Sequence, residues 1–335
     1  KLDEAIIEAG GNEDLVGCIT IPTIQATDNL MRHPDTAMIL ATGGAAMVRA
    51  AYSSGTPAIG VGPGNGPAFI ERTADLNKAV RQILESKTFD NGTVCASEQS
   101  VICETDMKDA VKAELIRQGA YFLTTDQAKK LGKFILRGDG TMNPQVVGRS
   151  VQVIARLAEI DVPAEARVLI AEEDGVGRGH PYSNEKLAPI LAFYCEENYQ
   201  KVCERCQEIL RYEGAGHTFI IHTQDTAMVD YFAKSIPVSR IVVNSPGALG
   251  GIGGTTGLFP SLTLGCGAIG GSATSDNVGP MNLLNLRHVA CGIRELDEIR
   301  AGVPDCPEGI CRTDTYPPID VDAIVRKVIE RLQLA

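Results

Sequence analysis

The sequence has no cluster of Lys or Arg, no apolar run long enough to cross a membrane and no secretory signal. Its formal charge is −11 at pH 7, whereas nucleic acid binding needs a basic face, so no nucleic acid partner is expected. The ten cysteines lie mostly inside apolar runs. Together these features predict a cytoplasmic protein with free thiols and no membrane partner.

A metal site is also not expected. Cys203 and Cys206 form a C-x-x-C, which is the spacing of many redox and zinc sites. They lie in an expected amphipathic helix over 199–212, and no second Cys/His pair follows at metal spacing. Packing of this helix is therefore the preferred interpretation of the two cysteines.

The 335 residues suffice for about two domains, and one short stretch organises them. Residues 89–99 read FDNGTVCASEQ and place Cys95 on a small polar loop between a helix over 79–87 and an apolar strand over 100–103. A thiol on such a turn can be reached by a substrate, and nearby backbone N–H groups can favour its thiolate. The alternative is a buried cysteine that acts as a small hydrophobe.

A second motif is a strand, a turn of small residues and a helix over 37–48. The turn, Thr42-Gly43-Gly44, leaves the first N–H groups of the helix free, which suits a pyrophosphate. The alternative is an ordinary βα turn that uses glycine for its dihedral angles. The later G-x-G-x-G of 60–64 is not a dinucleotide fingerprint, because two prolines interrupt the stretch and an apolar segment follows where a helix should begin.

These motifs, together with Glu185-x-x-x-Pro189 and the Gly-rich stretch around His217, resemble the aldehyde dehydrogenase superfamily, specifically its CoA-acylating branch. That branch includes the microcompartment propionaldehyde dehydrogenases and the aldehyde dehydrogenase half of bifunctional aldehyde/alcohol dehydrogenases. The resemblance extends to about Ala290. It implies an α/β fold with a Rossmann-type NAD domain over 1–65, a catalytic domain over 66–265 and a return segment over 266–300. The family's preceding strands and oxyanion-hole asparagine are expected to be missing from this chain.

The resemblance also implies roles for single residues. Cys95 is the expected nucleophile, Thr42, Gly43 and Gly44 hold the dinucleotide diphosphate, and Glu185 binds the nicotinamide ribose. Without the resemblance, Glu185 reads as an exposed loop carboxylate.

The resemblance assigns the choice of acyl acceptor to two further positions. Val61 occupies the position where hydrolytic members carry a water-activating glutamate, so the acyl-enzyme is expected to wait for another acceptor. His217 is the expected base for the CoA thiol, and His180 is the second candidate. From spacing alone, His217 is instead a strand-end histidine bonded to a backbone carbonyl.

The expected function is NAD-dependent oxidation of a short-chain aldehyde, propionaldehyde or acetaldehyde, with CoA to acyl-CoA through a Cys95 thioester. The alternatives are hydrolytic oxidation to an acid, and a non-catalytic fragment retained for assembly. A homo-oligomer is expected.

The end of the chain is expected to form a Pro- and Gly-rich linker over 301–318 and an amphipathic helix over 319–335. The helix either packs on its own or a sister subunit, or resembles the encapsulation peptides that dock on microcompartment shell proteins. The second interpretation places the protein inside a bacterial microcompartment.

The remaining patterns predict further elements. Strands are expected over 16–21, 168–172 and 240–244, helices over 2–9, 27–32, 108–118 and 126–135, and uncharged loops over 246–257 and 265–271.

Overall fold

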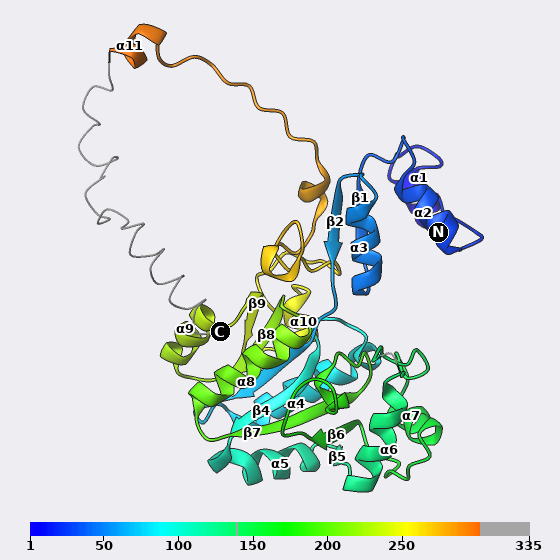
Figure 1. Cartoon of the computed structure of the whole chain (residues 1–335), viewed down its shortest axis with the longest axis vertical. Coiled ribbons are helices and arrows are strands. Elements are labelled where there is room, and N and C mark those ends of the chain that lie inside the picture. The colour runs from blue at the N-terminus through cyan, green and yellow to red at the C-terminus, as the bar shows by residue number, and fades with distance from the viewer. Residues whose placement is uncertain (139, 302–335) are drawn as a thin grey trace, which may run out of the picture. The chain divides into compact units, whose positions relative to one another are not determined.

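The computed structural model describes residues 1–138 and 140–301. It divides into two compact units, residues 1–284 and 285–335, and the described part of the second contains one short helix, α11 (Leu296–Arg300) (Figure 1). The predicted terminal helix and all but the first residue of the predicted linker lie outside the described residues. The domain boundaries expected from the sequence stay predictions.

The first unit is built around a seven-stranded, fully parallel sheet with the order β5-β6-β7-β4-β3-β8-β9. Its strands are β3 (Gly66–Ile70), β4 (Glu98–Glu104), β5 (Ala120–Phe122), β6 (Val168–Glu172), β7 (Ile190–Glu196), β8 (Gly216–His222) and β9 (Val238–Val243). Strands β3, β4 and β8 are buried along their whole length, as expected for a parallel sheet covered on both faces.

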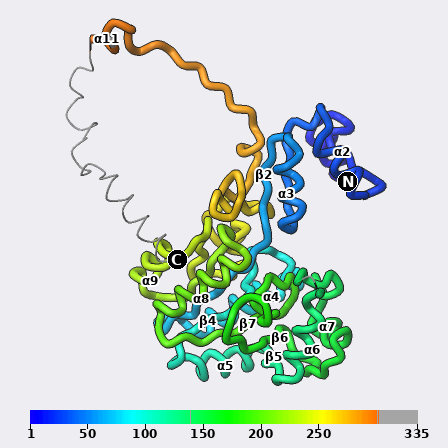
Figure 2. Tube along the Cα trace, in the orientation of Figure 1, coloured from blue at the N-terminus to red at the C-terminus, as the bar shows by residue number. Residues whose placement is uncertain are grey.

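Helices cover both faces of this sheet, and Figure 2 follows the same path as a tube. They are α4 (Leu76–Thr88), α5 (Lys108–Arg117), α6 (Thr125–Ile135), α7 (Val151–Leu157), α8 (Tyr199–Tyr212) and α9 (Thr226–Ser235). Successive strand residues point to opposite faces, so Phe69 joins the core under α6 to α9 while Ile70 joins the core under α4 and α5. Helix α4, for example, begins where Asp75 accepts the Lys78 N–H at 3.0 Å.

Before this sheet, the chain forms a smaller part with a two-stranded parallel sheet. Its elements are α1 (Leu2–Glu8), α2 (Ile24–Met31), β1 (Ile39–Thr42), α3 (Ala45–Ser53) and β2 (Ala58–Val61). The core here is small and consists of Met31, Ile39, Ala41 and Ala51 with Ala58 against it.

Two sequence expectations need correction. The strand expected over 16–21 is wrong: the segment is irregular and exposed, because its β-branched residues have no neighbouring strand among the described residues. The loop expected over 246–257 contains a short helix, α10 (Gly247–Gly251). The other helices and strands form where the sequence places them, within a few residues at their ends.

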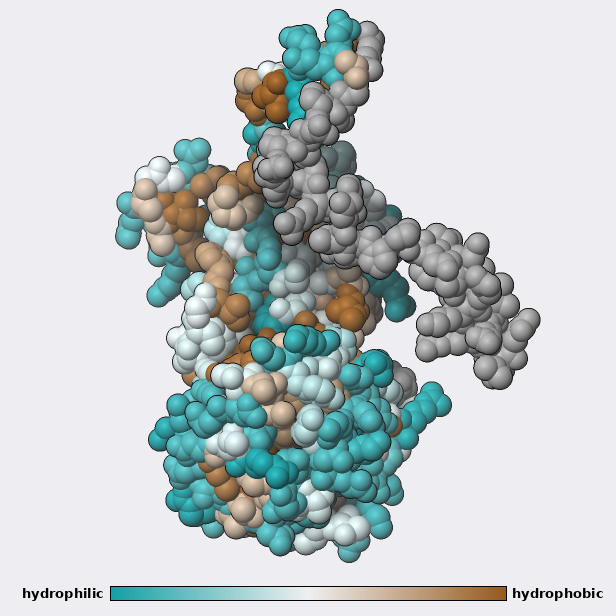
Figure 3. All heavy atoms as spheres, turned by 90° about the vertical axis from the view of Figure 1, so that its left-hand side faces the viewer, coloured by the Kyte–Doolittle hydropathy of each residue, from teal (hydrophilic) through white to brown (hydrophobic). Residues whose placement is uncertain are grey.

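The hydropathy of the surface differs between regions of the molecule. In Figure 3 the large lower lobe is mostly hydrophilic, and hydrophobic residues gather mainly outside it. Within residues 1–138 and 140–301, no helix combines the length and apolar character that a membrane span requires.

Candidate active site

A cavity of about 710 Å³ brings together residues that are far apart in the sequence. Cys95, Glu185, Val61 and the turn Thr42–Gly44 all line it, so six of the positions singled out in the sequence meet in one place. The other lining residues are Ala45, Ala46, Gly62, Pro63, Asp90, Thr93, Val94, Gly140, Thr141, Met142, Asn184, Leu187, Glu213 and Leu262. We call this space the Cys95 cavity.

The loop that carries Cys95 has an unusual backbone. Asp90, Asn91 and Gly92 all have positive φ, at 48°, 50° and 75°, a conformation that side chains other than that of glycine rarely adopt. The Asn91 side chain secures the loop by donating to the Gly148 carbonyl at 3.1 Å. Two successive non-glycine residues held this way represent backbone strain, which is typical of functional loops.

The glycine-rich segment after β9 packs against the back of the same loop. The N–H of Gly247 donates to the buried Glu98 carboxyl at 2.7 Å, and a Cβ on Gly251 would lie 2.5 Å from that of Ala96. Small residues are therefore required in α10 because the backbone of the nucleophile loop approaches it closely.

The Cys95 thiol is mostly protonated at neutral pH. Burial raises its pKa to about 12, the nearby Glu185 carboxyl raises it further, and the cation of Arg240 offsets part of this. Burial therefore outweighs the backbone N–H groups that were expected to favour the thiolate. The nucleophile consequently needs a proton acceptor when it reacts.

Gly64 connects three of the predicted site residues. A Cβ at this position would lie 2.0 Å from the carbonyl oxygen of Cys95 and 3.2 Å from Cε1 of His217. Its own N–H donates to Oε1 of Glu185 at 2.9 Å. The G-x-G-x-G stretch therefore supplies close backbone approach to the nucleophile, which sequence reasoning did not identify.

His217 is completely buried and does not line the Cys95 cavity. Its Nδ1 lies 2.9 Å from the Thr218 hydroxyl, and its buried Nε2 has no protein partner. Burial, with the Arg240 cation as a second cause, lowers the pKa of His217 to about 3, so the ring is neutral at pH 7. A neutral ring with an unpartnered nitrogen can accept a hydrogen bond from a ligand that reaches it.

Arg240 is a residue that sequence reasoning missed. It lies on β9 and donates to the carbonyls of His217 at 2.9 Å and Gly265 at 2.7 Å, so it links the histidine to the glycine-rich segment. The available signal was one arginine directly before the apolar run 241–243.

Glu185 belongs to a group of ionisable side chains at the edge of the Cys95 cavity. Burial raises the pKa of its carboxyl to about 8, against the Gly64 N–H that lowers it, and the neighbouring Glu213 raises it further. Lys87 and Lys186 lie fully buried behind it, both bonded to the Gln99 side chain: Lys87 through its ammonium at 3.1 Å and Lys186 through its backbone N–H at 3.1 Å. Sequence reasoning missed both lysines.

The turn Thr42–Gly44 opens into the Cys95 cavity at the start of α3. Gly44 precedes the helix, and Ala45 and Ala46 line the cavity with the first-turn N–H groups that have no acceptor within the helix. An added Cβ on Gly44 would meet nothing within 4 Å, so the approach is open. This turn and the carboxyl of Glu185 fit the diphosphate and a ribose hydroxyl of a dinucleotide.

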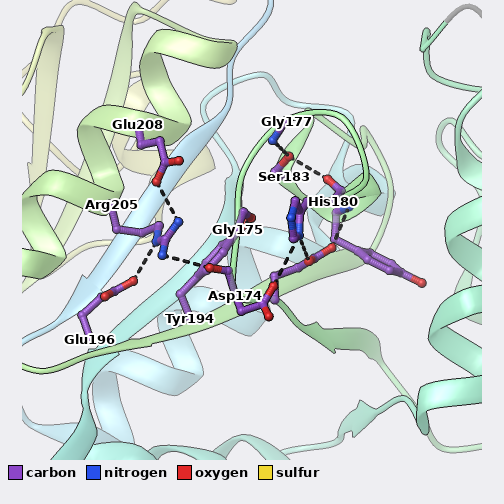
Figure 4. A network of polar contacts seen from close by, with 11 residues as sticks. Asp174, Gly175, Gly177, His180, Ser183, Tyr194, Glu196, Arg205 and Glu208 are labelled. Carbon is purple, nitrogen blue, oxygen red and sulfur yellow. Dashed lines mark hydrogen bonds and ion pairs between the residues drawn. The ribbon is translucent and has the colours of Figure 1, made fainter.

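His180, the second candidate base, lies elsewhere. Its Nδ1 is 2.9 Å from the Glu173 carboxylate and 3.5 Å from that of Asp174, in the network of Figure 4. It is not among the residues that line the Cys95 cavity. These three side chains place ligand atoms within 4.8 Å of one another, which is compact enough for a cation.

Comparison with known proteins shows which family the chain belongs to. The model of the aldehyde dehydrogenase family matches residues 1–199. The chain belongs to this family. The bifunctional aldehyde-alcohol dehydrogenase AdhE of Escherichia coli K12 is 44% identical over 292 residues, which cover 86% of this chain and 33% of AdhE.

Solved structures of aldehyde dehydrogenases are similar in fold as well. A probable aldehyde dehydrogenase from Listeria monocytogenes EGD-e is 64% identical with a TM-score of 0.87, over 89% of this chain and 66% of that one. An acetylating aldehyde dehydrogenase from Geobacillus thermoglucosidasius is 48% identical with a TM-score of 0.86. The match covers 88% of this chain and 65% of that one. The chain thus spans about a third of AdhE and about two thirds of these solved chains.

One more distant aldehyde dehydrogenase structure contains a ligand. The propionaldehyde dehydrogenase of Rhodopseudomonas palustris, solved with bound CoA and an acylated cysteine, is 29% identical with a TM-score of 0.72, over 78% of this chain and 59% of that one. The aldehyde dehydrogenase fold expected from the sequence is therefore confirmed.

Proposed function

We propose that this protein oxidises a short-chain aldehyde, propionaldehyde or acetaldehyde, with NAD and CoA to give the acyl-CoA. The observation that carries the proposal is the Cys95 cavity, where Cys95, the turn Thr42–Gly44 and the carboxyl of Glu185 meet. The similarity to acetylating dehydrogenases and to an enzyme solved with CoA and an acylated cysteine supports it.

The chemistry begins at Cys95. Its thiol proton passes to solvent water, and the sulfur attacks the aldehyde carbonyl to form a thiohemiacetal. The Cys95 backbone N–H is the donor that we assign to the developing oxyanion. Oxidation of the thiohemiacetal to the Cys95 thioester would use the hydride acceptor that NAD would supply if held by the turn Thr42–Gly44 and the carboxyl of Glu185. The CoA sulfur then attacks this thioester, forming acyl-CoA and returning the Cys95 thiolate.

Val61 determines which acceptor takes the acyl group. It lines the Cys95 cavity, is 2% exposed and cannot accept a proton. The resemblance places a water-activating glutamate at this position in hydrolytic members, and a buried aliphatic side chain leaves water without that base. The thioester accordingly persists until CoA arrives.

His217 is the proposed base for the CoA thiol. Because its ring is neutral and its Nε2 has no protein partner, it can accept the thiol proton of a CoA molecule that reaches it. His217→Ala should retain one turnover of NADH and lower steady acyl-CoA formation by roughly 10²–10⁴-fold. Stopped-flow absorbance at 340 nm separates the phases, and equal loss of both would remove His217 from the thiol-transfer step.

The proposal is tested by incubating the purified chain with NAD, propionaldehyde and CoA and analysing the products by mass spectrometry. Propionyl-CoA is expected, and acetaldehyde should give acetyl-CoA. Propionate formed without CoA would instead indicate the hydrolytic alternative. NAD and CoA binding without any product would indicate a non-catalytic fragment.

The homo-oligomer and the microcompartment location stay predictions. Fusing residues 316–335 to a fluorescent protein in cells that make microcompartment shells tests the second. Punctate fluorescence is expected, and diffuse fluorescence would contradict it.

A further inference from the structure

Two cysteines on neighbouring strands of the seven-stranded sheet lie close together, and the proposed chemistry uses neither of them. Cys103 on β4 and Cys195 on β7 are in-register partners of the parallel β4–β7 ladder, and each is the last residue but one of its strand. Their Sγ atoms lie 3.6 Å apart, and both are free thiols. The fold therefore holds two thiols in contact that are 92 positions apart in the sequence.

The strand geometry is suitable for a disulfide between these two residues. Neighbouring strands lie about 4.7–4.9 Å apart, within the Cα separations of about 4.4–6.8 Å that disulfides span. Both side chains also lie on the same face of the sheet, against the core under α4 and α5. The sulfur atoms would have to approach by about 1.5 Å to reach bonding distance, with no change of strand pairing.

The two thiols differ in their access to solvent. Cys103 is fully buried, whereas Cys195 is half-buried and lines a cavity of about 450 Å³. The other residues of this cavity are Lys108, Glu172, Glu173, Asp174, Phe193, Glu196 and Arg205. A small molecule that enters the cavity can therefore reach the sulfur of Cys195, and the sulfur of Cys103 lies directly behind it.

The surroundings of Cys195 favour its thiolate. The hydrogen bond with the Cys103 thiol, followed by the ammonium groups of Lys108 and Lys112, lowers the pKa of Cys195, although partial burial and the Glu172 carboxylate oppose this. The same hydrogen bond and burial raise the pKa of Cys103, so that thiol keeps its proton. An accessible thiolate with a second thiol beside it is the arrangement of a reactive cysteine and its resolving partner.

We infer that Cys103 and Cys195 form a redox site that a hydroperoxide, ROOH, converts into a reversible disulfide. The Cys195 thiolate attacks the terminal oxygen of ROOH. An S–O bond forms, the O–O bond breaks, and the leaving alkoxide takes a proton from solvent to become ROH.

The resulting sulfenic acid is then resolved by the second thiol. The Cys103 sulfur attacks the Cys195 sulfur, an S–S bond forms, and the leaving hydroxide takes the Cys103 proton to become water. In total the two thiols lose two electrons and two protons, and one hydroperoxide is reduced to ROH and water. Exchange with a small dithiol reverses the modification.

This redox site is separate from the Cys95 cavity. Cys95 precedes β4, whereas Cys103 lies near the opposite end of this strand, about 16 Å beyond Glu98 along the strand. Neither Cys103 nor Cys195 lines the Cys95 cavity. The inference therefore does not depend on the proposed function, and its test does not require the chain to form acyl-CoA.

The test treats the folded full chain with an equal concentration of hydrogen peroxide at pH 7, then unfolds it in excess N-ethylmaleimide and maps the unreduced peptides by mass spectrometry. We expect a peptide in which Cys103 and Cys195 are joined, lighter by two hydrogen atoms than its two halves. Dithiothreitol added before N-ethylmaleimide should remove this peptide.

The chain contains a matched control in Cys203 and Cys206, which share one face of α8. Both of these thiols are buried, and burial raises the pKa of each, so they should be oxidised at least roughly tenfold less. Equal oxidation of the two pairs would overturn the inference, because accessibility and the neighbouring cations would then have no effect.

Two variants separate the roles of the two thiols. In Cys103→Ala, Cys195 should stop at the sulfenic acid, which dimedone traps and mass spectrometry detects. In Cys195→Ala, Cys103 should stay reduced because it is buried. Oxidation of Cys103 in that variant, or the absence of the joined peptide from the unmodified chain, would overturn the inference. The second of these results is independent of whether either variant folds.

Discussion

The two walls of the Cys95 cavity are built differently. Cys95 and Glu185 come from the seven-stranded part, which has two extensive cores of fully buried side chains behind them. Thr42–Gly44 and Val61 come from the two-stranded part, whose core has four buried members and whose Ile24 is 91% exposed.

The two walls differ because a wall that holds a nucleophile and a wall that binds a cofactor have different structural needs. The wall with Cys95 needs a fixed and strained backbone, which only a dense surrounding core can maintain. The wall with the cofactor turn needs open N–H groups and space. Changes on the first wall should therefore affect the chemistry, and changes on the second should affect dinucleotide affinity.

The largest effect is expected at the nucleophile. Cys95→Ala should abolish acyl-CoA formation while NAD affinity stays unchanged, because the thiol is the only atom group removed. Product analysis and NAD calorimetry check both halves. Cys18→Ala, which removes an exposed thiol from the two-stranded part, is the control that should keep full activity. Substantial acyl-CoA from Cys95→Ala would mean that another group carries the acyl chain.

The next effect comes from the backbone behind the nucleophile. In Gly64→Ala the new methyl group would overlap the Cys95 carbonyl, so the loop must shift. We expect a loss of about 1–3 kcal/mol in unfolding free energy and of roughly 10²-fold in acyl-CoA formation.

Thermal unfolding and a product assay measure these changes. Gly62→Ala is the matched control for stability, since its methyl group would meet nothing within 4 Å. If both variants unfold at the same temperature, the close approach at Gly64 does not constrain the loop.

A smaller effect is expected on the cofactor wall. Ala45→Glu places a negative charge beside the first turn of α3, where it should repel a diphosphate and weaken NAD binding by about tenfold. Single-turnover chemistry at saturating NAD should be unchanged. Calorimetry checks this against Ala50→Glu, which adds the same charge later in the helix. Equal weakening by the two variants would place the diphosphate elsewhere.

The mildest test uses pH. With the pKa of Cys95 raised to about 12, the thiolate is a small fraction at pH 7 and grows about tenfold for each pH unit below that pKa. Alkylation of Cys95 by iodoacetamide should therefore keep rising from pH 7 to 10, whereas an unfolded peptide thiol levels off near its pKa of about 8.5. Peptide mass spectrometry follows the rate, and a plateau below pH 9 would show that the thiol is less buried than described.

The sequence was sufficient where local patterns and a family resemblance coincide. The strand, turn and helix around Thr42–Gly44, the nucleophile loop and the step from Glu185 to Pro189 all form as expected and meet in one cavity. The strand over 16–21 failed because a strand depends on a neighbour that no local pattern reveals.

The features that depend on distant contacts could not be predicted. The approach of Gly64 to Cys95 and His217, and the buried Lys87 and Lys186, result from the packing of separate strands.

The proposed chemistry requires Cys95 to carry an acyl group that water does not remove. The direct measurement mixes the chain with NAD and propionaldehyde without CoA, and follows NADH absorbance and the mass of the Cys95 peptide together. We predict one NADH per site, a propionyl group on Cys95, and renewed turnover on adding CoA. Continuous NADH production without CoA, or a burst that leaves Cys95 unmodified, would contradict the claim.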